Sequence, residues 1–556
     1  MTNNSLQERS WWKEGIVYQI YPRSFKDTSG NGVGDLRGII QKLDYIKSLG
    51  VTMVWLNPIY ESPNDDNGYD ISDYRAIMKE FGTMEDFDEL LEGLHKRGMK
   101  FIMDVVVNHS SDEHEWFQQS RSSRDNSYRD YYHWWPAEKG KPNHRWSFFD
   151  ENSDAWKYDE QTDAYYLHYF SQKQPDLNWE NNKVREEVYD VMKFWLDKGI
   201  DGFRMDVIPF ISKDQDFNNL SKKELLNPEK VYASGPRLHE FLKEMNSKVL
   251  SKYDILSIGE AFGISEDTMI QLSDEREEEL DLVFLFDIIR IGRENWIQNK
   301  WNLAQLKKLF NTQSSVDEFH WPTVFLNNHD NPRSVSKYGN DKDYRIKSAK
   351  LLAMLTLTQR GTPILYQGEE IGMTNYNFSE LTQFDDLEVL GNLSKAISSG
   401  ISKKEYILYL NKTSRDHSRT TMQWRSVTKG GFSNGNNNWF LSNPNHDRIN
   451  VENDLNNEDS IFHFYRKLLQ IRKQSKDLIY GHYFDLDPNH QNIFIYQRVG
   501  LKTTYLIILN MSDSLINYNF NNLTEYSLEF SNLNKKPRIS SNQIELLAWD
   551  ALMFKK

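Results

Sequence analysis

The chain has 556 residues, of which 27% are charged and 38% hydrophobic, a composition that supplies a large core and excludes a wholly disordered or collagen-like protein. Its formal net charge of -14 disfavours a nucleic-acid partner, because no basic excess is present to displace counterions from a phosphate backbone. The chain contains no cysteine, which excludes disulfides, thiolate metal sites and a cysteine nucleophile.

The first 15 residues lack the basic start and apolar run of a signal peptide, and no stretch of about 18 apolar residues occurs. We therefore expect a cytoplasmic protein without a membrane partner. A neutral or polar small molecule fits the acidic composition as a substrate, and we expect a monomer.

Eight short apolar runs bounded by turn residues recur along the first two thirds of the chain, and their burial on both faces is typical of parallel strands. They are IVYQIYP from Ile16, VTMVWLNP from Val51, KFIMDVVVNHS from Lys100, GFRMDVI from Gly202, DILSIGEAF from Asp254, DLVFLFDI from Asp281, TVFLNNHD from Thr323 and TPILYQGEE from Thr362. Helical patterns lie between them, for example at residues 35–50 and 83–98. This alternation predicts an α/β fold, a (β/α)8 TIM barrel, with a doubly wound sheet as the alternative.

The spacing of these runs predicts insertions in the barrel. Almost a hundred residues separate the third and fourth runs, so we expect an inserted B domain at residues 109–176, after strand three. The barrel would then comprise residues 1–108 and 177–479, with a further inserted subdomain at about 374–453 after strand eight. Alternating segments such as NIFIYQRV and TTYLIILNMS predict a C-terminal antiparallel β-sandwich domain at residues 480–556.

Polar side chains fall at the carboxyl ends of the predicted strands, which converge on one mouth of a barrel. They are Asp104, Asn108 and His109 after strand three, Arg204 and Asp206 at strand four, Glu260 at strand five, and His329 and Asp330 at strand seven. A helix cap or a surface salt bridge would explain any single acid. Their joint placement instead indicates an active site, and two carboxyl groups are the minimum apparatus for glycoside hydrolysis.

Residues 27–35, DTSGNGVGD, alternate oxygen-bearing side chains with glycines. Asp27, Ser29, Asn31 and Asp35 would suit a hard cation such as Ca²⁺. A glycine-rich turn without a metal is the alternative, because only two full carboxylates are available.

Five motifs resemble the signature regions of the α-amylase family, glycoside hydrolase family 13. DVVVNHS, GFRMDVI, GEAF and FLNNHD are similar to its four main regions in order and spacing, and QPDLNW, residues 174–179, resembles the further signature of its oligo-1,6-glucosidase branch. The resemblance covers essentially the whole chain. It implies a retaining, exo-acting α-glucosidase with Asp206 as nucleophile, Glu260 as general acid/base and Asp330 as the third acid, which grips sugar hydroxyls.

The same resemblance implies the residues around the substrate. Arg204 would keep the nucleophile ionised, and His109 and His329 would hydrogen-bond the terminal glucose. Asp66 would bind that sugar, Tyr69 would stack on it, and Arg415 would pair with Asp66. Phe149 and Phe170 either line the entrance or pack in the core. The Val33 carbonyl would be a further ligand of a Ca²⁺ ion in the 27–35 loop.

Details of the sequence separate the functions within this family. Val207, directly after the nucleophile, resembles enzymes that prefer α-1,6 linkages, whereas Thr there would resemble maltases and sucrose isomerases. Sucrose isomerases carry an RLDRD-like motif after strand six; residues 290–294 here read RIGRE, which keeps both arginines but has Gly292 and Glu294 in place of the two Asp residues. We therefore expect hydrolysis of isomaltose-type substrates, with a sucrose isomerase, a sucrose hydrolase or a transglucosylating α-1,4-glucosidase as alternatives. The non-enzymatic transporter subunits that resemble this barrel need a membrane anchor and no complete acid triad, so the triad disfavours them.

Overall fold

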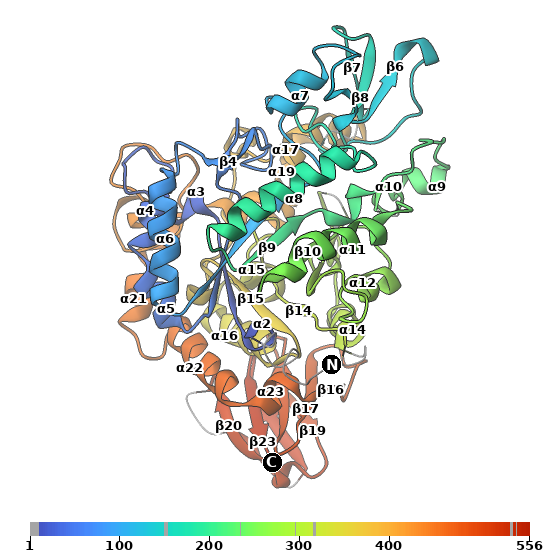
Figure 1. The fold of residues 1–556 in the computed structure, drawn as a ribbon. Helices are drawn as coiled ribbons and strands as arrows, with labels where there is room; N and C mark the ends of the chain where they lie inside the picture. The colour runs from blue at the N-terminus through green and yellow to red at the C-terminus, as the bar shows by residue number, and fades with distance from the viewer. Residues whose placement is uncertain are drawn as a thin grey trace.

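Eight parallel strands run up through the middle of the molecule (Figure 1). The computed structural model describes residues 11–149, 154–233, 235–294, 296–314, 319–533, 537–540 and 542–556. The strands are β1 Val17–Ile20, β2 Met53–Leu56, β5 Lys100–Val106, β9 Gly202–Asp206, β10 Leu256–Ala261, β11 Leu282–Leu285, β14 Thr323–Val324 and β15 Thr362–Tyr366. Each predicted run contains one of these strands, which confirms the eight-strand prediction.

The hydrogen-bonded order is β11-β10-β9-β5-β2-β1-β15-β14, and the two ends of this series meet. The Thr323 hydroxyl on β14 donates to the Val283 carbonyl on β11 at 3.0 Å, and Phe284 and Phe325 meet edge to face at 5.2 Å. A closed sheet has no exposed edge, so the fold is a barrel and the doubly wound alternative is wrong.

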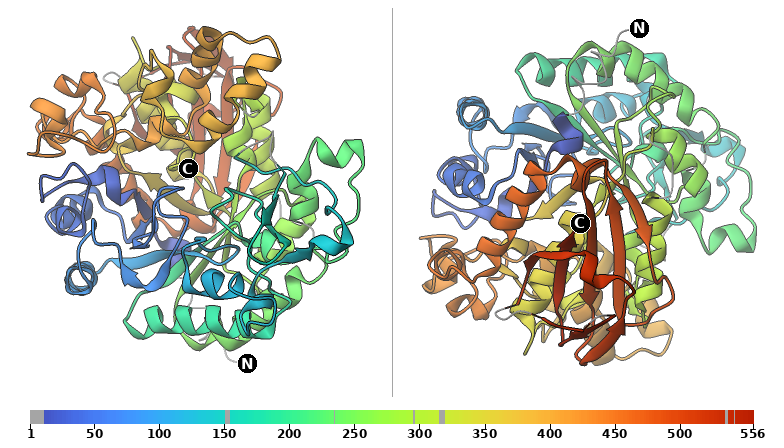
Figure 2. Two further views of the ribbon diagram at one scale, coloured as in Figure 1. Left: turned by 90° about the horizontal axis from the view of Figure 1, so that it is seen from above. Right: turned by 90° about the horizontal axis from the view of Figure 1, so that it is seen from below.

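Helices surround the barrel in the views from above and below (Figure 2). The helices that precede or connect the barrel strands are α2 Trp11–Glu14, α3 Pro22–Phe25, α4 Leu36–Ile40, α5 Leu43–Leu49, α6 Met84–Lys96, α8 Asn182–Asp197, α9 Lys222–Leu225, α10 Pro228–Tyr232, α11 Leu238–Lys248, α12 Glu266–Leu272, α13 Asp287–Arg290, α14 Leu303–Ser314, α15 Ser334–Tyr338 and α16 Arg345–Thr358. Helix α6 illustrates the local cause. Thr83 and Asp86 form a reciprocal capping box at its start, and Phe87, Leu90, Leu91 and Leu94 place one apolar stripe against the barrel.

The inserted B domain lies above the barrel (Figure 1). It contains α7 Glu115–Ser120 and the antiparallel strands β6 Trp134–Pro136, β7 Trp156–Asp159 and β8 Ala164–Leu167, in the order β6-β8-β7. An antiparallel bridge between His109 and Asp176 joins the two ends of the insertion. These elements fall within the predicted residues 109–176, although the predicted limits of the domains stay predictions.

A second insertion follows β15 on the same rim. It contains α17 Leu387–Gly391, α18 Leu393–Ser398, α19 Lys403–Thr413, α20 Asp416–Arg419 and α21 Val451–Leu455. The loop after β2 forms a hairpin of β3 Tyr60–Glu61 and β4 Asp73–Ile77, and β12 Arg293–Glu294 pairs with β13 Ile297–Gln298 after β11. Long connections are therefore concentrated at the carboxyl ends of the barrel strands.

Two antiparallel sheets follow α22 Ile461–Gln474 and α23 Lys476–Tyr480 and lie below the barrel (Figure 2). Their strands are β16 His482–Asp485, β17 Ile493–Val499, β18 Thr504–Asn510, β19 Ile516–Asn519, β20 Ser527–Ser531, β21 Arg538–Ile539, β22 Gln543–Leu546 and β23 Ala551–Lys555. Buried Arg498 of β17 donates to the carbonyl of Thr358 at 2.7 Å, which ties the sheet to the end of barrel helix α16. The predicted C-terminal β domain is confirmed.

Within the described residues, no helix combines the length and the apolar character that crossing a bilayer requires.

Candidate active site

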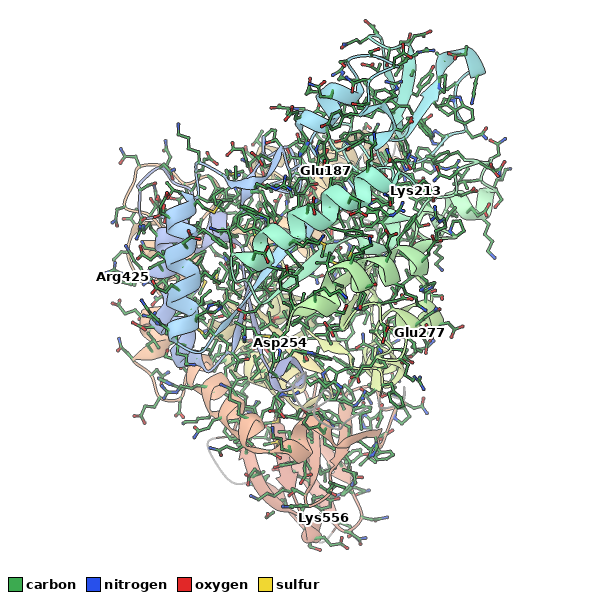
Figure 3. The ribbon with its side chains drawn as sticks, in the orientation of Figure 1. Glu187, Lys213, Asp254, Glu277, Arg425 and Lys556 are labelled. Carbon is green, nitrogen blue, oxygen red and sulfur yellow. The ribbon has the colours of Figure 1, made fainter. Side chains whose placement is uncertain are left out.

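Four strand-end residues meet because side chains two positions apart share one face of a strand. Arg204 and Asp206 therefore point the same way from β9, and the register between β5 and β9 pairs Asp104 with Arg204. Glu260 stands near the end of neighbouring β10. Figure 3 labels Asp254, just before β10, at the lower end of the strands, and it labels Lys213, in the loop after β9, near their upper end. Asp206 and Glu260, at the carboxyl ends of β9 and β10, therefore lie on the side of the barrel that faces the B domain.

The Arg204 guanidinium is the centre of this group and is itself buried. Its Nη1 lies 2.9 Å from Asp104 Oδ1 and 2.8 Å from Asp206 Oδ1, and its Nη2 makes an ion pair with Glu260 Oε2. Asp206 and Glu260 therefore occupy neighbouring nitrogens of one planar group. This arrangement brings the predicted nucleophile and the predicted acid/base together.

Burial and charge act in opposite directions on these acids. Burial raises the pKa of Asp206 to about 7, while the positive charge of Arg204 opposes that rise. Burial likewise raises the pKa of Asp104, against the same guanidinium. Removing the arginine would thus leave two buried carboxyl groups without their main counter-charge.

Asp330 lies in a group of arginines from the second insertion. Its Oδ1 accepts from Arg415 at 3.1 Å and, at 3.4 Å, from Arg419. Burial alone would raise the pKa of Asp330, but the adjoining His329 ring and the charges of Arg415 and Arg419 hold it below its ordinary value. The third acid is therefore ionised.

The structure differs from the prediction that Arg415 pairs with Asp66. Arg415 instead forms ion pairs with Asp386 and Asp330; its Nε lies 2.9 Å from Asp386 Oδ2. Its charge still lowers the pKa of Asp66, although burial outweighs this and raises that pKa to about 8. Asp386 takes the guanidinium because its two oxygens accept from Nε and Nη2 together, the bidentate geometry that arginine favours.

Asp66 and Tyr69 lie in the hairpin loop between β3 and β4, and both are buried. Gln174 Nε2 donates to Asp66 Oδ2 at 3.1 Å. The Tyr69 ring lies parallel to the His329 ring, with 5.4 Å between their centroids, and its hydroxyl donates to Asp104 Oδ2 at 3.1 Å. The loop thus brings both predicted sugar-binding residues to the edge of the acid group.

Both predicted histidines are buried in this region. Burial lowers the pKa of His109 to about 3 and that of His329 to about 3. The two rings are therefore neutral near pH 7. His329 Nε2 lies 3.1 Å from Asp330 Oδ2, whereas His109 Nε2 lies 3.2 Å from the Tyr69 carbonyl oxygen.

Aromatic rings border the site. Phe170 packs 5.1 Å from the His109 ring and 5.6 Å from Phe149, and Arg415 lies 5.2 Å above the Phe149 ring. Phe170 also belongs to an apolar cluster that includes Val207, so it both packs in a core and borders the site. Val207 has φ of 34°, a left-handed conformation that is strained for a β-branched residue.

The 27–35 loop is closed by its own hydrogen bonds. Asp27 accepts from the amides of Gly30 and Gly32, at 2.8 and 2.9 Å, and Asn31 Oδ1 accepts from the Val33 amide at 2.8 Å. Asp35 accepts from the Thr28 amide and caps α4. Burial opposes ionisation of Asp27, yet hydrogen bonds led by that of Ser433 hold its pKa below the ordinary value. The oxygen atoms of this loop suit a hard cation, but a bound ion would have to replace hydrogen bonds that the carboxylates already accept.

Three residues of the site were not among the sequence-based predictions. Arg419, which contacts Asp330, lies four residues after Arg415, at the end of α20. Asp386, which holds Arg415, lies in an irregular stretch of the second insertion where nothing in the sequence marks it. Gln174, which holds Asp66, opens the QPDLNW motif, so the motif was the signal that could have identified it.

The comparisons with known proteins are extensive. The family described as alpha amylase, catalytic domain, matches residues 19–481. An oligo-1,6-glucosidase from Parageobacillus thermoglucosidasius is 47% identical over 99% of both chains, and one from Bacillus cereus is 48% identical over 91% of both. Among solved structures, the isomaltulose synthase of Klebsiella sp. LX3 superposes with a TM-score of 0.95 at 45% identity, over 98% of this chain and 99% of that one.

Proposed function

The chain belongs to the α-amylase family of glycoside hydrolases, and from this we propose that it is a retaining, exo-acting oligo-1,6-glucosidase. It would hydrolyse terminal α-1,6-linked glucose from isomaltose and isomaltooligosaccharides. The observation that carries the proposal is the pair Asp206 and Glu260 on neighbouring nitrogens of Arg204, together with the buried Asp66 and Tyr69 and the partly buried Asp330.

The chemistry assigns one role to each acid. The Asp206 carboxylate attacks the anomeric carbon while the glycosidic C–O bond breaks, and Glu260 gives its proton to the departing oxygen. A water molecule then attacks the glucosyl ester and gives a proton to Glu260. Because the anomeric carbon is inverted in each of the two steps, the released glucose keeps the original anomeric configuration. The shared guanidinium supports the short carboxyl separation, about 5 to 5.5 Å, that this double displacement needs.

Asp330, Asp66 and the two histidines would hold the glucose hydroxyls. Ionised Asp330 offers a hydrogen-bond acceptor, and the neutral histidines add bonds without adding charge. Phe149, Phe170 and Val207 would supply an apolar border for the leaving sugar.

The alternative is a sucrose isomerase on the same scaffold, favoured by the structural likeness to isomaltulose synthase. The RIGRE stretch argues against it. Arg293 donates to Glu388 at 2.9 Å and to the Thr413 carbonyl at 3.0 Å, and Arg290 pairs with Glu229 at 2.9 Å, so protein groups engage both arginines.

The test is to incubate the protein separately with isomaltose, panose, maltose and sucrose and to identify the products by chromatography. We expect glucose from isomaltose at the highest kcat/KM. Conversion of sucrose mainly into an isomeric disaccharide, or a preference for maltose, would contradict the proposal.

A Ca²⁺ ion in the 27–35 loop, held by Asp27, Asn31, Asp35 and the Val33 carbonyl with Ser29 as a weaker ligand, is proposed as a stabilising ion without a catalytic part. The oxygen chemistry of the loop supports it. The monomeric state and the cytoplasmic location stay predictions of the sequence.

A further inference from the structure

Lys213 is a completely buried ammonium group between the barrel and the B domain (Figure 3). Its Nζ donates to Asn108 Oδ1 at 2.8 Å and to the Phe210 carbonyl at 2.7 Å, and it lies 3.3 Å from Asp176 Oδ2. An ammonium has three N–H groups and no acceptor, so every hydrogen-bond partner of Lys213 must accept. The part of the Asn108 amide that faces Lys213 must therefore be its oxygen.

The other end of that amide faces a histidine. Asn108 Nδ2 lies 3.1 Å from His109 Nδ1, and an NH2 group can only donate. His109 Nδ1 must therefore accept, which leaves the proton of the neutral ring on Nε2. The Tyr69 carbonyl oxygen, 3.2 Å from Nε2, agrees with this assignment because it can only accept. The Gln174 NH2 group also lies 3.2 Å from Nε2, but its two hydrogens are donated to Asp66 Oδ2 at 3.1 Å and to the Tyr69 carbonyl at 3.4 Å, so it does not require Nε2 to accept.

We propose that Lys213 is a positioning residue which, by orienting the Asn108 amide, fixes His109 as its Nε2–H tautomer. The ring then presents a hydrogen-bond donor beside Asp66 and Tyr69. That this donor meets a hydroxyl of the terminal glucose rests on the proposed function, whereas the tautomer itself does not.

His329 provides an independent reference for the same property. The Tyr69 hydroxyl donates to Asp104 Oδ2, so its oxygen accepts from His329 Nε2 at 2.8 Å. Gln19 Nε2 then donates to His329 Nδ1 at 2.9 Å. This chain of hydrogen bonds ends on a carboxylate and does not pass through Lys213, so changes at Lys213 should leave His329 as it is.

The first experiment is ¹⁵N NMR of the full chain labelled in its 14 histidines, with His109→Gln and His329→Gln variants for assignment. We expect a pyridine-type Nδ1 and a pyrrole-type Nε2 for both rings. Asn108→Asp replaces the donating NH2 by an acceptor, so His109 Nδ1 should become protonated while His329 stays unchanged. A pyrrole-type Nδ1 of His109 in the wild type, or an unprotonated one in Asn108→Asp, would overturn the proposal.

The second experiment removes the ammonium. Lys213→Met combined with Asp176→Asn deletes both charges together, so that neither is left buried alone. We expect a second His109 tautomer in the spectrum and, on isomaltose, a KM increase of roughly 3- to 10-fold with a smaller change in kcat, the loss of about one oriented hydrogen bond. Lys307→Met is the matched control, because this buried lysine donates, among the residues that the structure describes, to the carbonyls of Asp487 and His490 in the C-terminal domain.

The spectra are recorded on the free protein, so they stand even where the protein hydrolyses another glucoside. An unchanged His109 spectrum in the Lys213→Met, Asp176→Asn double variant, or the same spectral change in Lys307→Met, would show that Lys213 does not fix the His109 tautomer.

Discussion

Asp206 and Glu260 act at the scale of single atoms, and their conservative variants test the assigned roles. Asp206→Asn removes the nucleophile and Glu260→Gln removes the proton donor, while both keep the shape that packs against Arg204. We expect turnover of isomaltose to fall by at least about 10² to 10⁴-fold in each. The circular dichroism spectrum and melting temperature control for folding, and near-native activity of either well-folded variant would refute the role.

The ionisation of Asp206 predicts a pH dependence. Because burial raises the pKa of Asp206 to about 7, its carboxyl group is protonated below that pH and ionises as the pH rises through it. Only the ionised form is a nucleophile, so kcat/KM should increase along an acid limb well above the ordinary aspartate value of about 3.9. The midpoint of this acid limb should be the same for two substrates with different leaving groups, because kcat/KM reports ionisation of the free enzyme. A limb near the ordinary value would show that Arg204 outweighs burial.

Val207 tests the linkage preference. Thr has nearly the same volume and is also β-branched, so Val207→Thr keeps the strain of a φ of 34° and adds only a hydroxyl. We expect the ratio of kcat/KM for isomaltose over maltose to fall several-fold, since one hydrogen bond contributes about 0.5 to 1.5 kcal/mol. Val207→Ile, which adds a methylene and no hydroxyl, is the control. An unchanged ratio in Val207→Thr would remove this residue from linkage selection.

At the scale of elements, the 27–35 loop can be stabilised in two ways, by its own hydrogen bonds and by a bound ion. Its carboxylates already hold backbone amides, so the loop is folded by its own bonds, and a bound ion would add stability by mass action. We expect the melting temperature to rise between chelator and millimolar Ca²⁺ in the wild type. Asp27→Asn should lower the melting temperature in both media and abolish the difference between them. Equal melting of the wild type in both media would contradict the calcium proposal.

The elements also show what the sequence could predict. All eight strands were predictable because runs such as KFIMDVVV are buried on both faces and bounded by turns. β14 is shorter than its run, because the chain leaves the ladder after Val324 to carry His329 and Asp330 into the site. The partner of Arg415 was not predictable: Asp386 approaches it from an irregular loop, and only the folded insertion brings the two together.

At the scale of the whole molecule, one buried arginine joins the barrel to the C-terminal domain, and a second holds α22, the helix that leads towards that domain, against the barrel. Arg498 donates to the carbonyls of Thr358, Ile479 and Gly481, and Arg472 donates to those of Leu357, Gln359 and Gly361. Carbonyl groups left without a donor in a dry interface are costly. The two parts should therefore unfold together.

Arg498→Met tests this coupling, since it keeps much of the side-chain volume and removes every donor. We expect it to destabilise the folded state by about 2 kcal/mol or more, with a lower melting temperature in calorimetry. Lys502→Met, at an exposed position of the same domain, is the control. Two separated transitions in the wild type would show that the barrel and the C-terminal domain unfold independently.

One guanidinium, that of Arg204, serves as counter-ion to Asp104, Asp206 and Glu260 at once. When one of these acids is replaced by a neutral residue, the guanidinium interacts more strongly with the two acids that remain. Free-energy changes within the trio will therefore not sum, and a double-mutant cycle between Asp206 and Glu260 measures this redistribution together with their direct coupling. A second substitution among the three acids can have little effect only because the first has already altered the interactions of the other two with Arg204. The order in which substitutions accumulate therefore decides which of them the enzyme tolerates.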